Sequence, residues 1–285
     1  MRTDSSSVSQ TEIEHCNELA LLPGSLFEFT SRFVSADRRE PLLALYALKQ
    51  AVSTIPQAPV EDTVKWAKLK WWSEEFSADP VAPSRHPVLR VLQASGARRH
   101  LDNGLLQRLV RDAIMQIDVA PNSDENALFE SMATMGATDI QLELALDHAE
   151  IETRDLELLG AATRLCRVIS SFGESHDAEV EQIPLNLRAK YDIRLEEPDQ
   201  VQNTEALAQL LGELAGKGLE WSSEGLAGLR ATLDTGACRH LQLRLAMESR
   251  RLGAITRNAN IVFDAHQHYG PGDAWFAWRF LRRLK

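Results

Sequence analysis

Four acidic residues recur at helical spacing near the middle of the chain: Asp139, Glu143, Asp147 and Glu150. Because an α-helix turns about 100° per residue, these carboxylates would form one narrow stripe. Such a stripe could hold a hard divalent cation, which prefers carboxylate oxygens. It could equally be the solvated face of an amphipathic helix. The apolar residues between the acids favour this second interpretation.

A second group of potential metal ligands comprises Asp264, His266 and His268. No cysteine or further histidine stands near it in the sequence, so a polar loop is the favoured interpretation. The chain has three cysteines, which are far apart and follow neither a zinc nor a disulfide spacing. We expect them to be reduced core thiols. They are Cys16, Cys166 and Cys238.

The composition is that of a globular protein, with 285 residues, 44% of them hydrophobic and 25% charged. The net charge of −10 predicts that nucleic acid is not a partner, because phosphate contacts need clustered Lys and Arg. The first residues lack the apolar segment of a signal peptide, and no apolar run is long enough to span a membrane. We therefore expect a cytoplasmic protein, with peripheral binding to the inner membrane face left open.

Hydrophobic periodicity predicts helices along almost the whole chain, with no alternating strand pattern and no repeat, so the expected fold class is all-α. Pro41 is expected in the first turn of its helix, and Pro56 should end that helix near Thr54. Residues 1–11 read as a flexible lead-in and 180–202 as irregular. The expected helices cover 25–33, 41–54, 62–76, 88–94, 102–117, 125–151, 153–173, 203–221 and 223–256.

The segment 273–285 is basic and aromatic, in contrast to the acidic chain. As a helix it could lie in a membrane interface, with aromatic rings toward the lipid and bases toward anionic head groups. It could also cap the core, or contact a protein partner. The residues expected at the membrane or partner are Trp275, Trp278, Arg279, Arg282 and Arg283.

Three separated blocks carry a family resemblance. The first, GSLFEFTSRFVSADRREPLLALYALKQ, covers Gly24 to Gln50, and the second, KLKWWSEEF, covers Lys68 to Phe76 and is followed by His86-Pro87-Val88. The third runs from Leu158 to Ile193 and contains the dipeptide Ile183-Pro184. In order and spacing these blocks resemble the squalene/phytoene synthase family. The resemblance implies an isoprenoid-synthase fold, a single helical domain over residues 12–272 built around a central cavity.

The same resemblance implies Mg²⁺ chemistry that this sequence does not support. The family holds Mg²⁺ with two Asp-rich motifs, and the ions neutralise a departing diphosphate. The acids of the first motif fall here on Ser53, Thr54 and Gln57, and those of the second on Ser171 and Ser175. We therefore expect no metal site, no cofactor and no catalytic residue. Glu174 and Asp177 flank the second motif, but pairing with Arg167 or exposure to water is favoured over weak metal binding.

Other positions that the resemblance places in the cavity could still bind a ligand. Arg164 and Arg167 replace polar family residues on the cavity side of their helix, and Phe29 and Tyr46 lie in the first block. Two guanidinium groups could hold a prenyl diphosphate or a lipid head group without metal. The favoured alternative is that they neutralise acids inside a closed cavity.

Three functions compete on this basis. The first is a non-enzymatic accessory, assembly or membrane-associated binding protein, similar to a branch of the family that includes a mitochondrial complex I assembly factor. The second is an active head-to-head transferase acting on farnesyl or geranylgeranyl diphosphate through an atypical site. The third is an isoprenoid or lipid carrier. The loss of the aspartates favours the first.

Overall fold

The computed structural model describes residues 8–117, 121–172, 182–193, 204–233, 238–264 and 269–284. Every regular element among these residues is a helix, and none of them lies in a strand, which confirms the predicted all-α class. The chain divides into two compact units. The first contains Met1–Ile117 and Gln141–Ala149, and the second contains Asp118–Ile140 and Glu150–Lys285.

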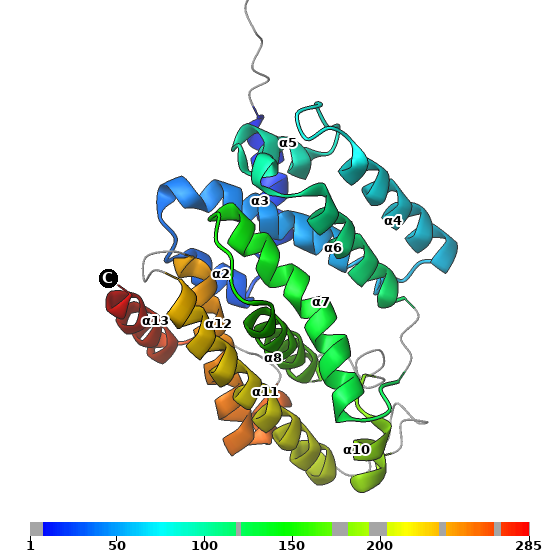
Figure 1. Ribbon diagram of the computed structural model, residues 1–285, viewed down its shortest axis with the longest axis vertical. Coiled ribbons are helices and arrows are strands. Elements are labelled where there is room, and N and C mark those ends of the chain that lie inside the picture. The colour runs from blue at the N-terminus through cyan, green and yellow to red at the C-terminus, as the bar shows by residue number, and fades with distance from the viewer. Residues whose placement is uncertain are drawn as a thin grey trace, which may run out of the picture. The chain divides into compact units, whose positions relative to one another are not determined.

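Helix α3 is the centre of the first unit (Figure 1). Helices α1, α5 and α6 pack against it, and α4 packs against α6. Phe76, Leu45 and Leu48 are among the largest fully buried side chains of this unit, because the apolar residues of these helices meet at its centre. The helices are α1 (Gln10–Ala20), α2 (Leu26–Ser31), α3 (Ala36–Ser53), α4 (Asp62–Ser77), α5 (Pro87–Ala94), the 3₁₀ turn η1 (Ala97–His100) and α6 (Asn103–Met115).

The start of the first helix differs from the expectation. Ser9 and Glu12 form a capping box, in which each side chain accepts a hydrogen bond from the other residue's backbone N–H. Residues 10 and 11, expected in a flexible lead-in, are therefore helical, while residues 1–7 lie outside the described part of the chain.

Helix α3 also begins earlier than expected, at Ala36 instead of Pro41. Pro41 lies inside the helix, where it removes one backbone donor near the N-terminal end. The other end agrees with the expectation. Thr54 is the C-cap, and Pro56 follows two residues later.

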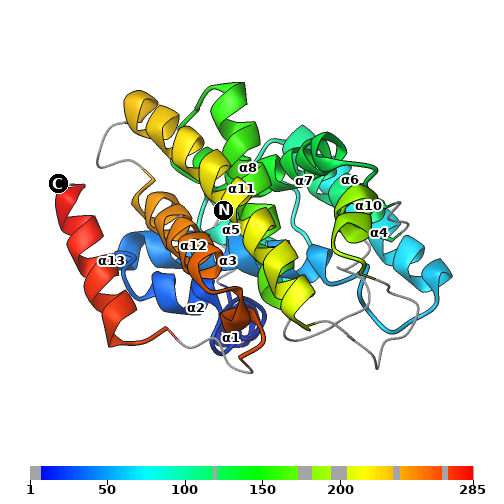
Figure 2. The ribbon, with the colours of Figure 1, turned by 90° about the horizontal axis from the view of Figure 1, so that it is seen from below.

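In the second unit, α11 packs along α8 and α12, and α13 packs on α12 (Figure 2). Phe172, Leu128 and Met132 are among its largest fully buried side chains. Helix α7 is shared, because its residues up to Ile140 belong to the second unit and the rest to the first. The elements are α7 (Glu125–Leu146), α8 (Thr153–Ser171), α10 (Leu185–Lys190), α11 (Thr204–Thr232), α12 (Arg239–Arg257), the 3₁₀ turn η2 (Ala259–Val262) and α13 (Pro271–Arg283).

Three boundaries differ from the sequence prediction. Helix α7 ends at Leu146 instead of 151, in a Schellman motif with His148 in the left-handed region (φ 53°). Helix α11 continues through the break expected near residue 222, because Ser222 is buried and the helix stays packed on α8. The segment expected to be irregular contains the short helix α10.

Helices α7 and α8 touch through two glycines, Gly136 and Gly160. A Cβ atom built on Gly136 would lie 2.0 Å from the backbone oxygen of Gly160, so only glycine fits there. Asp139 and Thr163 each stand three residues further along their helices, on the same sides as the glycines. The glycine contact therefore helps to set the distance between the polar residues of these two helices.

Candidate functional site

The positions of the first Asp-rich motif form the end of α3 and the turn after it. The Thr54 hydroxyl donates to the backbone oxygen of Gln50 at 2.8 Å, as the C-cap of the helix. Pro56 is buried in the turn, and the side chain of Gln57 is 3.5 Å from that of Gln116. This segment presents hydroxyl and amide groups and no carboxylate.

The second motif is described only in part. Ser171 is the last residue of α8, and its hydroxyl donates to the backbone oxygen of Val168 at 2.8 Å. Ser175 lies outside the described residues, as do Glu174, Asp177, His266 and His268.

Proteins usually anchor Mg²⁺ with one or two carboxylates, beside water and substrate phosphate oxygens. Ser53, Thr54, Gln57 and Ser171 provide neutral oxygens only. Among the described residues, no three or more His, Cys, Asp or Glu side chains gather in a way that could hold a metal ion. The residues at the motif positions therefore do not fit the metal site of the family. That the chain works without Mg²⁺ stays a prediction.

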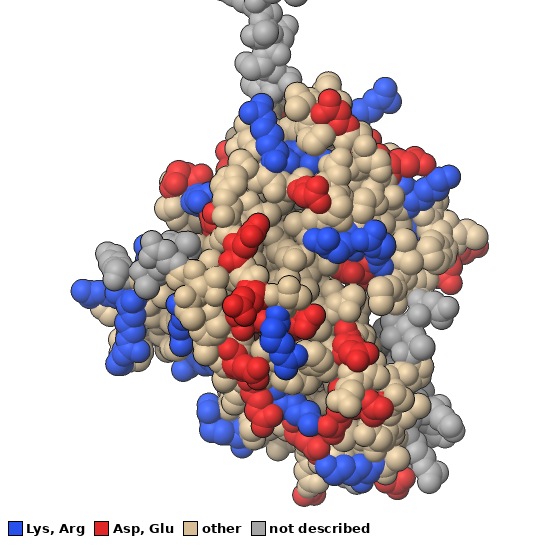
Figure 3. Space-filling view, viewed as in Figure 1, with Lys and Arg blue, Asp and Glu red and all other residues tan. Residues whose placement is uncertain are grey.

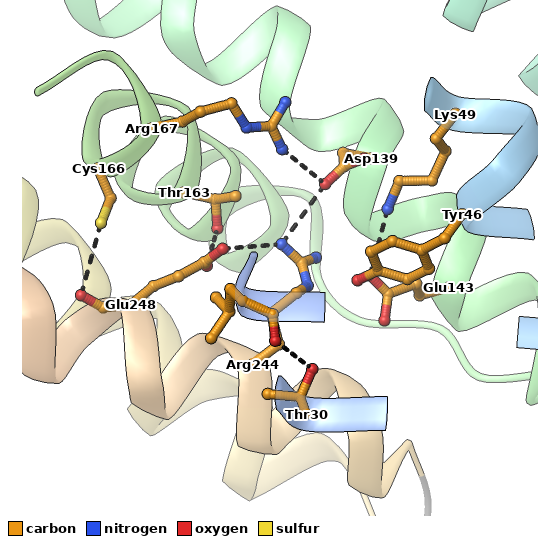
Figure 4. A network of polar contacts seen from close by, with 11 residues as sticks. Thr30, Tyr46, Lys49, Asp139, Glu143, Thr163, Cys166, Arg167, Arg244 and Glu248 are labelled. Atoms are coloured by element: carbon orange, nitrogen blue, oxygen red, sulfur yellow. Dashed lines mark hydrogen bonds and ion pairs between the residues drawn. The ribbon is translucent and has the colours of Figure 1, made fainter. Parts of the chain in front are cut away.

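A buried polar cluster in the first unit joins α3 to the last turns of α7 (Figure 4). The Tyr46 hydroxyl donates to Glu143 Oε1 at 2.6 Å, and Lys49 Nζ lies 3.4 Å from the same oxygen. Lys49 also lies over the Tyr46 ring at 4.0 Å, and Phe27 stacks on that ring with centroids 3.6 Å apart. The carboxylate of Glu143 is therefore enclosed by a cation and a hydroxyl.

A second cluster joins α7, α8 and α12 within the second unit (Figure 4). Arg244 is its centre: Nη1 lies 3.4 Å from Asp139 Oδ2 and 3.1 Å from Glu248 Oε1. Arg167 also reaches Asp139 at 3.4 Å, and the Thr163 hydroxyl donates to Glu248 at 2.8 Å. The buried guanidinium of Arg244 and the exposed guanidinium of Arg167 thus face two carboxylates.

These contacts correct the interpretation of the acidic stripe. Asp139 and Glu143 do not lie on a solvated helix face, because bases from neighbouring helices pair with them. Asp147 pairs with Arg38, and Glu150 is exposed beyond the end of α7. The pattern of acids identified the positions correctly, but it carried no information on the bases that meet them.

The predicted ligand-binding residues are held in different ways. Tyr46 and Arg167 take part in the two clusters, with carboxylate partners inside the protein. Arg164 is buried in α8, one turn before Arg167. Phe29 is 4% exposed and packs edge-on against Phe33 at 5.5 Å. Their binding of a ligand stays a prediction.

Sequence reasoning missed Lys49, Arg244 and Glu248, which are central to the clusters. One signal was present for two of them, since Arg244 and Glu248 stand four residues apart and so share a helix face. It also missed a pocket of about 410 Å³ in the first unit, between α1, α2 and α3. No position of the two Asp-rich motifs is among the residues that line this pocket; its walls include Leu21, Phe27, Leu42, Arg32 and Arg39.

Thiol groups add no reactive centre to these clusters. The Cys166 thiol donates to the backbone oxygen of Glu248 at 3.7 Å. Burial raises its pKa to about 12, and burial likewise raises the pKa of Cys16 to about 11. A thiol is nucleophilic as the thiolate, so neither group is primed for covalent chemistry.

The solved structures most useful for comparison define the class of fold. Squalene synthase HpnC from Alicyclobacillus acidocaldarius matches with a TM-score of 0.68 and 17% identity, over 87% of this chain and 94% of that one. A dehydrosqualene synthase solved in complex with a ligand matches with a TM-score of 0.71 and 13% identity, over 96% and 95% of the two chains. The chain therefore has the all-helical fold of the isoprenoid synthases.

The sequence places the chain within one family of that class. The family model for squalene/phytoene synthase matches residues 24–270. The chain belongs to the squalene/phytoene synthase family. Among curated proteins, none matches the sequence.

Proposed function

We propose that the chain is a family member that has lost prenyl-diphosphate condensation and acts as a non-enzymatic accessory or binding protein. The observation that carries this proposal is the end of α3, where Ser53, Thr54 and Gln57 replace the acids of the first motif. A diphosphate cannot leave readily without positive charge to neutralise it. Neutral hydroxyl and amide groups without a carboxylate bind the cations that would supply that charge only weakly.

The acids nearby offer little replacement. Glu143 is held by Lys49 and Tyr46, and Asp139 by Arg167 and Arg244. Removing a base from a buried ion pair leaves an uncompensated charge, so these carboxylates are not readily released to a metal ion. The two clusters therefore support a structural role for the charged groups of these helices.

A carrier is the second candidate, and the pocket of the first unit favours it. Its volume of about 410 Å³ falls within the range of small-molecule sites. Leu21, Phe27 and Leu42 give it an apolar wall, and Arg39 contributes a guanidinium group, whereas Arg32 is paired with Glu28. This combination suits an isoprenoid or lipid with an anionic head group.

Calorimetric titration with farnesyl diphosphate, with and without Mg²⁺, separates the three functions. The accessory role predicts no Mg²⁺-dependent binding. Binding that is strong without Mg²⁺, and that Arg39→Glu weakens, would establish the carrier instead. Binding that requires Mg²⁺ and releases diphosphate would refute the proposal and leave the chain as an atypical transferase.

A further inference from the structure

The last helix, α13, presents two different faces. Its inner side packs on α12 and includes Ala277 (0% exposed) and Leu284 (9% exposed), beside the partly buried Phe276 and Phe280. Its outer side carries Trp275 and Trp278, which are 57% and 51% exposed. The alternative in which these two indoles cap the core is therefore wrong. Two adjacent exposed indoles on one helix face form an apolar patch, and such patches often mark an interaction site.

Arginines surround the two indoles. Arg279, Arg282 and Arg283 are all exposed on the same face. The guanidinium of Arg279 lies 5.2 Å from the ring centre of Trp275, and that of Arg282 lies 4.7 Å from Trp278. These are cation–π distances, so a positive charge lies over the face of each indole. The outer face thus combines apolar rings with cations.

In the described part of the chain, no ion pair offsets the charge of Arg279, Arg282 or Arg283. Asp273 is the one acidic residue of α13; its carboxylate accepts from the backbone N–H of Gly270 at 3.0 Å and pairs with Arg250 at 3.4 Å. Arg239, exposed on the adjoining helix α12, extends the positive surface. Lys and Arg gather over α13 at the left of Figure 3, apart from the acidic side chains in the middle of the view. The patch is basic although the chain as a whole has a net charge of −10.

From this arrangement we infer that the outer face of α13 docks on an anionic membrane surface, with the helix parallel to the bilayer. Tryptophan is enriched at the level of the lipid head groups, where a ring can be partly buried and still meet water. Arginine binds the lipid phosphates, and a short amphipathic helix can lie in the interface without crossing the membrane. No helix among the described residues is both long and apolar enough for a membrane crossing.

Charge complementarity selects this partner over a nucleic acid. The chain as a whole carries a net charge of −10, so a long polyanion that extended beyond the patch would be repelled. A membrane needs contact with the outer face alone. The inference holds for an enzyme as well as for an accessory protein, so its failure would leave the proposed function untouched.

Sedimentation of the full-length protein with vesicles tests the inference. Vesicles of phosphatidylcholine with about one third phosphatidylglycerol should bind it, and pure phosphatidylcholine should bind it far more weakly. Each arginine at the surface contributes roughly fivefold, so changing Arg279, Arg282 and Arg283 to Glu should weaken binding by about a hundredfold or more. Raising the salt from about 0.1 M to about 1 M should release the protein, because the Debye length falls from about 10 Å to about 3 Å.

A matched variant controls for net charge. Arg85, Arg111 and Arg230 are exposed on other parts of the chain, and changing all three to Glu lowers the net charge by the same amount. This control should bind vesicles much more tightly than the α13 variant. Trp275→Ala with Trp278→Ala should weaken binding about tenfold while leaving the melting temperature nearly unchanged, since both rings are exposed.

Fluorescence reports directly on the position of the indoles. Lipids brominated near the head groups should quench the emission of the bound protein, and Trp275→Phe with Trp278→Phe should remove most of that quenching. The inference is overturned if anionic vesicles do not bind the protein at low salt, or if the control variant loses as much binding as the α13 variant. Absence of quenching in bound protein would overturn it as well. If the α13 face captured only RNA or a protein and no vesicles, the membrane would be the wrong partner.

Discussion

The contact between α7 and α8 can be tested at Gly136. In Gly136→Ala, the new methyl group would lie 2.0 Å from the backbone oxygen of Gly160 and 2.4 Å from its carbonyl carbon. Carbon and oxygen normally approach to about 3.3 Å, so the two helices must separate by roughly 1.3 Å. Both contacting atoms belong to the backbone, and no side-chain rotation can relieve the overlap.

The cost follows from this displacement. A gap of about 0.5–1 Å already forfeits a quarter to a half of each dispersion contact, and overpacking typically costs about 1–3 kcal/mol. Alanine regains about 1 kcal/mol through its higher helix propensity. Because the separation here exceeds 1 Å, we take the upper part of the overpacking range and expect a net loss of about 1–2 kcal/mol. At about 2–4 °C per kcal/mol, the melting temperature should fall by roughly 2–8 °C.

Gly212→Ala is the matched control for calorimetry. Gly212 lies inside α11, and a Cβ atom there would meet Ala259 at 3.8 Å, an ordinary contact. This substitution should stabilise the protein by about 0.5–1 kcal/mol. If the two variants melt at the same temperature, the close approach of α7 and α8 is refuted, and with it the spacing that brings Asp139 to Arg167.

Three further predictions concern charged and titratable groups. Arg244→Met should lower the free energy of unfolding in urea by about 3–5 kcal/mol, and Glu248→Gln in the same chain should recover part of it; a loss below about 1 kcal/mol would contradict the buried network. Burial lowers the pKa of His86 to about 4, and its Nδ1 accepts the N–H of Val88 as the cap of α5. Between pH 6.5 and 4 the unfolded chain therefore binds a proton that the native chain does not, so the free energy of unfolding should decrease as the pH is lowered through this window. His86→Asn should flatten this pH dependence. An unchanged slope would exclude His86 as its cause. The three cysteines are free and buried, so Ellman's reagent should label none in native protein and all three after unfolding; rapid labelling of the native protein would contradict their burial.

The sequence predicted the helices well where their limits depend on local chemistry. Pro56 ends α3 near Thr54, and the helix expected at 62–76 is found at Asp62–Ser77. The errors arose where tertiary packing decides. Ser222 looked like a break, but it is buried within α11, and the packing of that helix on α8 keeps it helical.

The same distinction applies to the candidate site. The loss of acids at Ser53, Thr54 and Gln57 is a prediction that the sequence allows, because the resemblance to the family places the first motif there. The partners of Asp139 and Glu143 could not be read, because Lys49 and Arg244 are 94 and 105 positions away from them in the chain and meet them only after folding. The sequence alone does not show which oppositely charged residues, far apart in the chain, will pair.

Loss of the condensation reaction is the central claim, and product analysis tests it most directly. The purified full-length protein would be incubated with farnesyl or geranylgeranyl diphosphate and Mg²⁺, with a catalytically competent family member as positive control. Mass spectrometry should then find no squalene, phytoene or related diphosphate intermediate above the no-protein background. A C30 or C40 product that requires both the protein and Mg²⁺ would contradict the account.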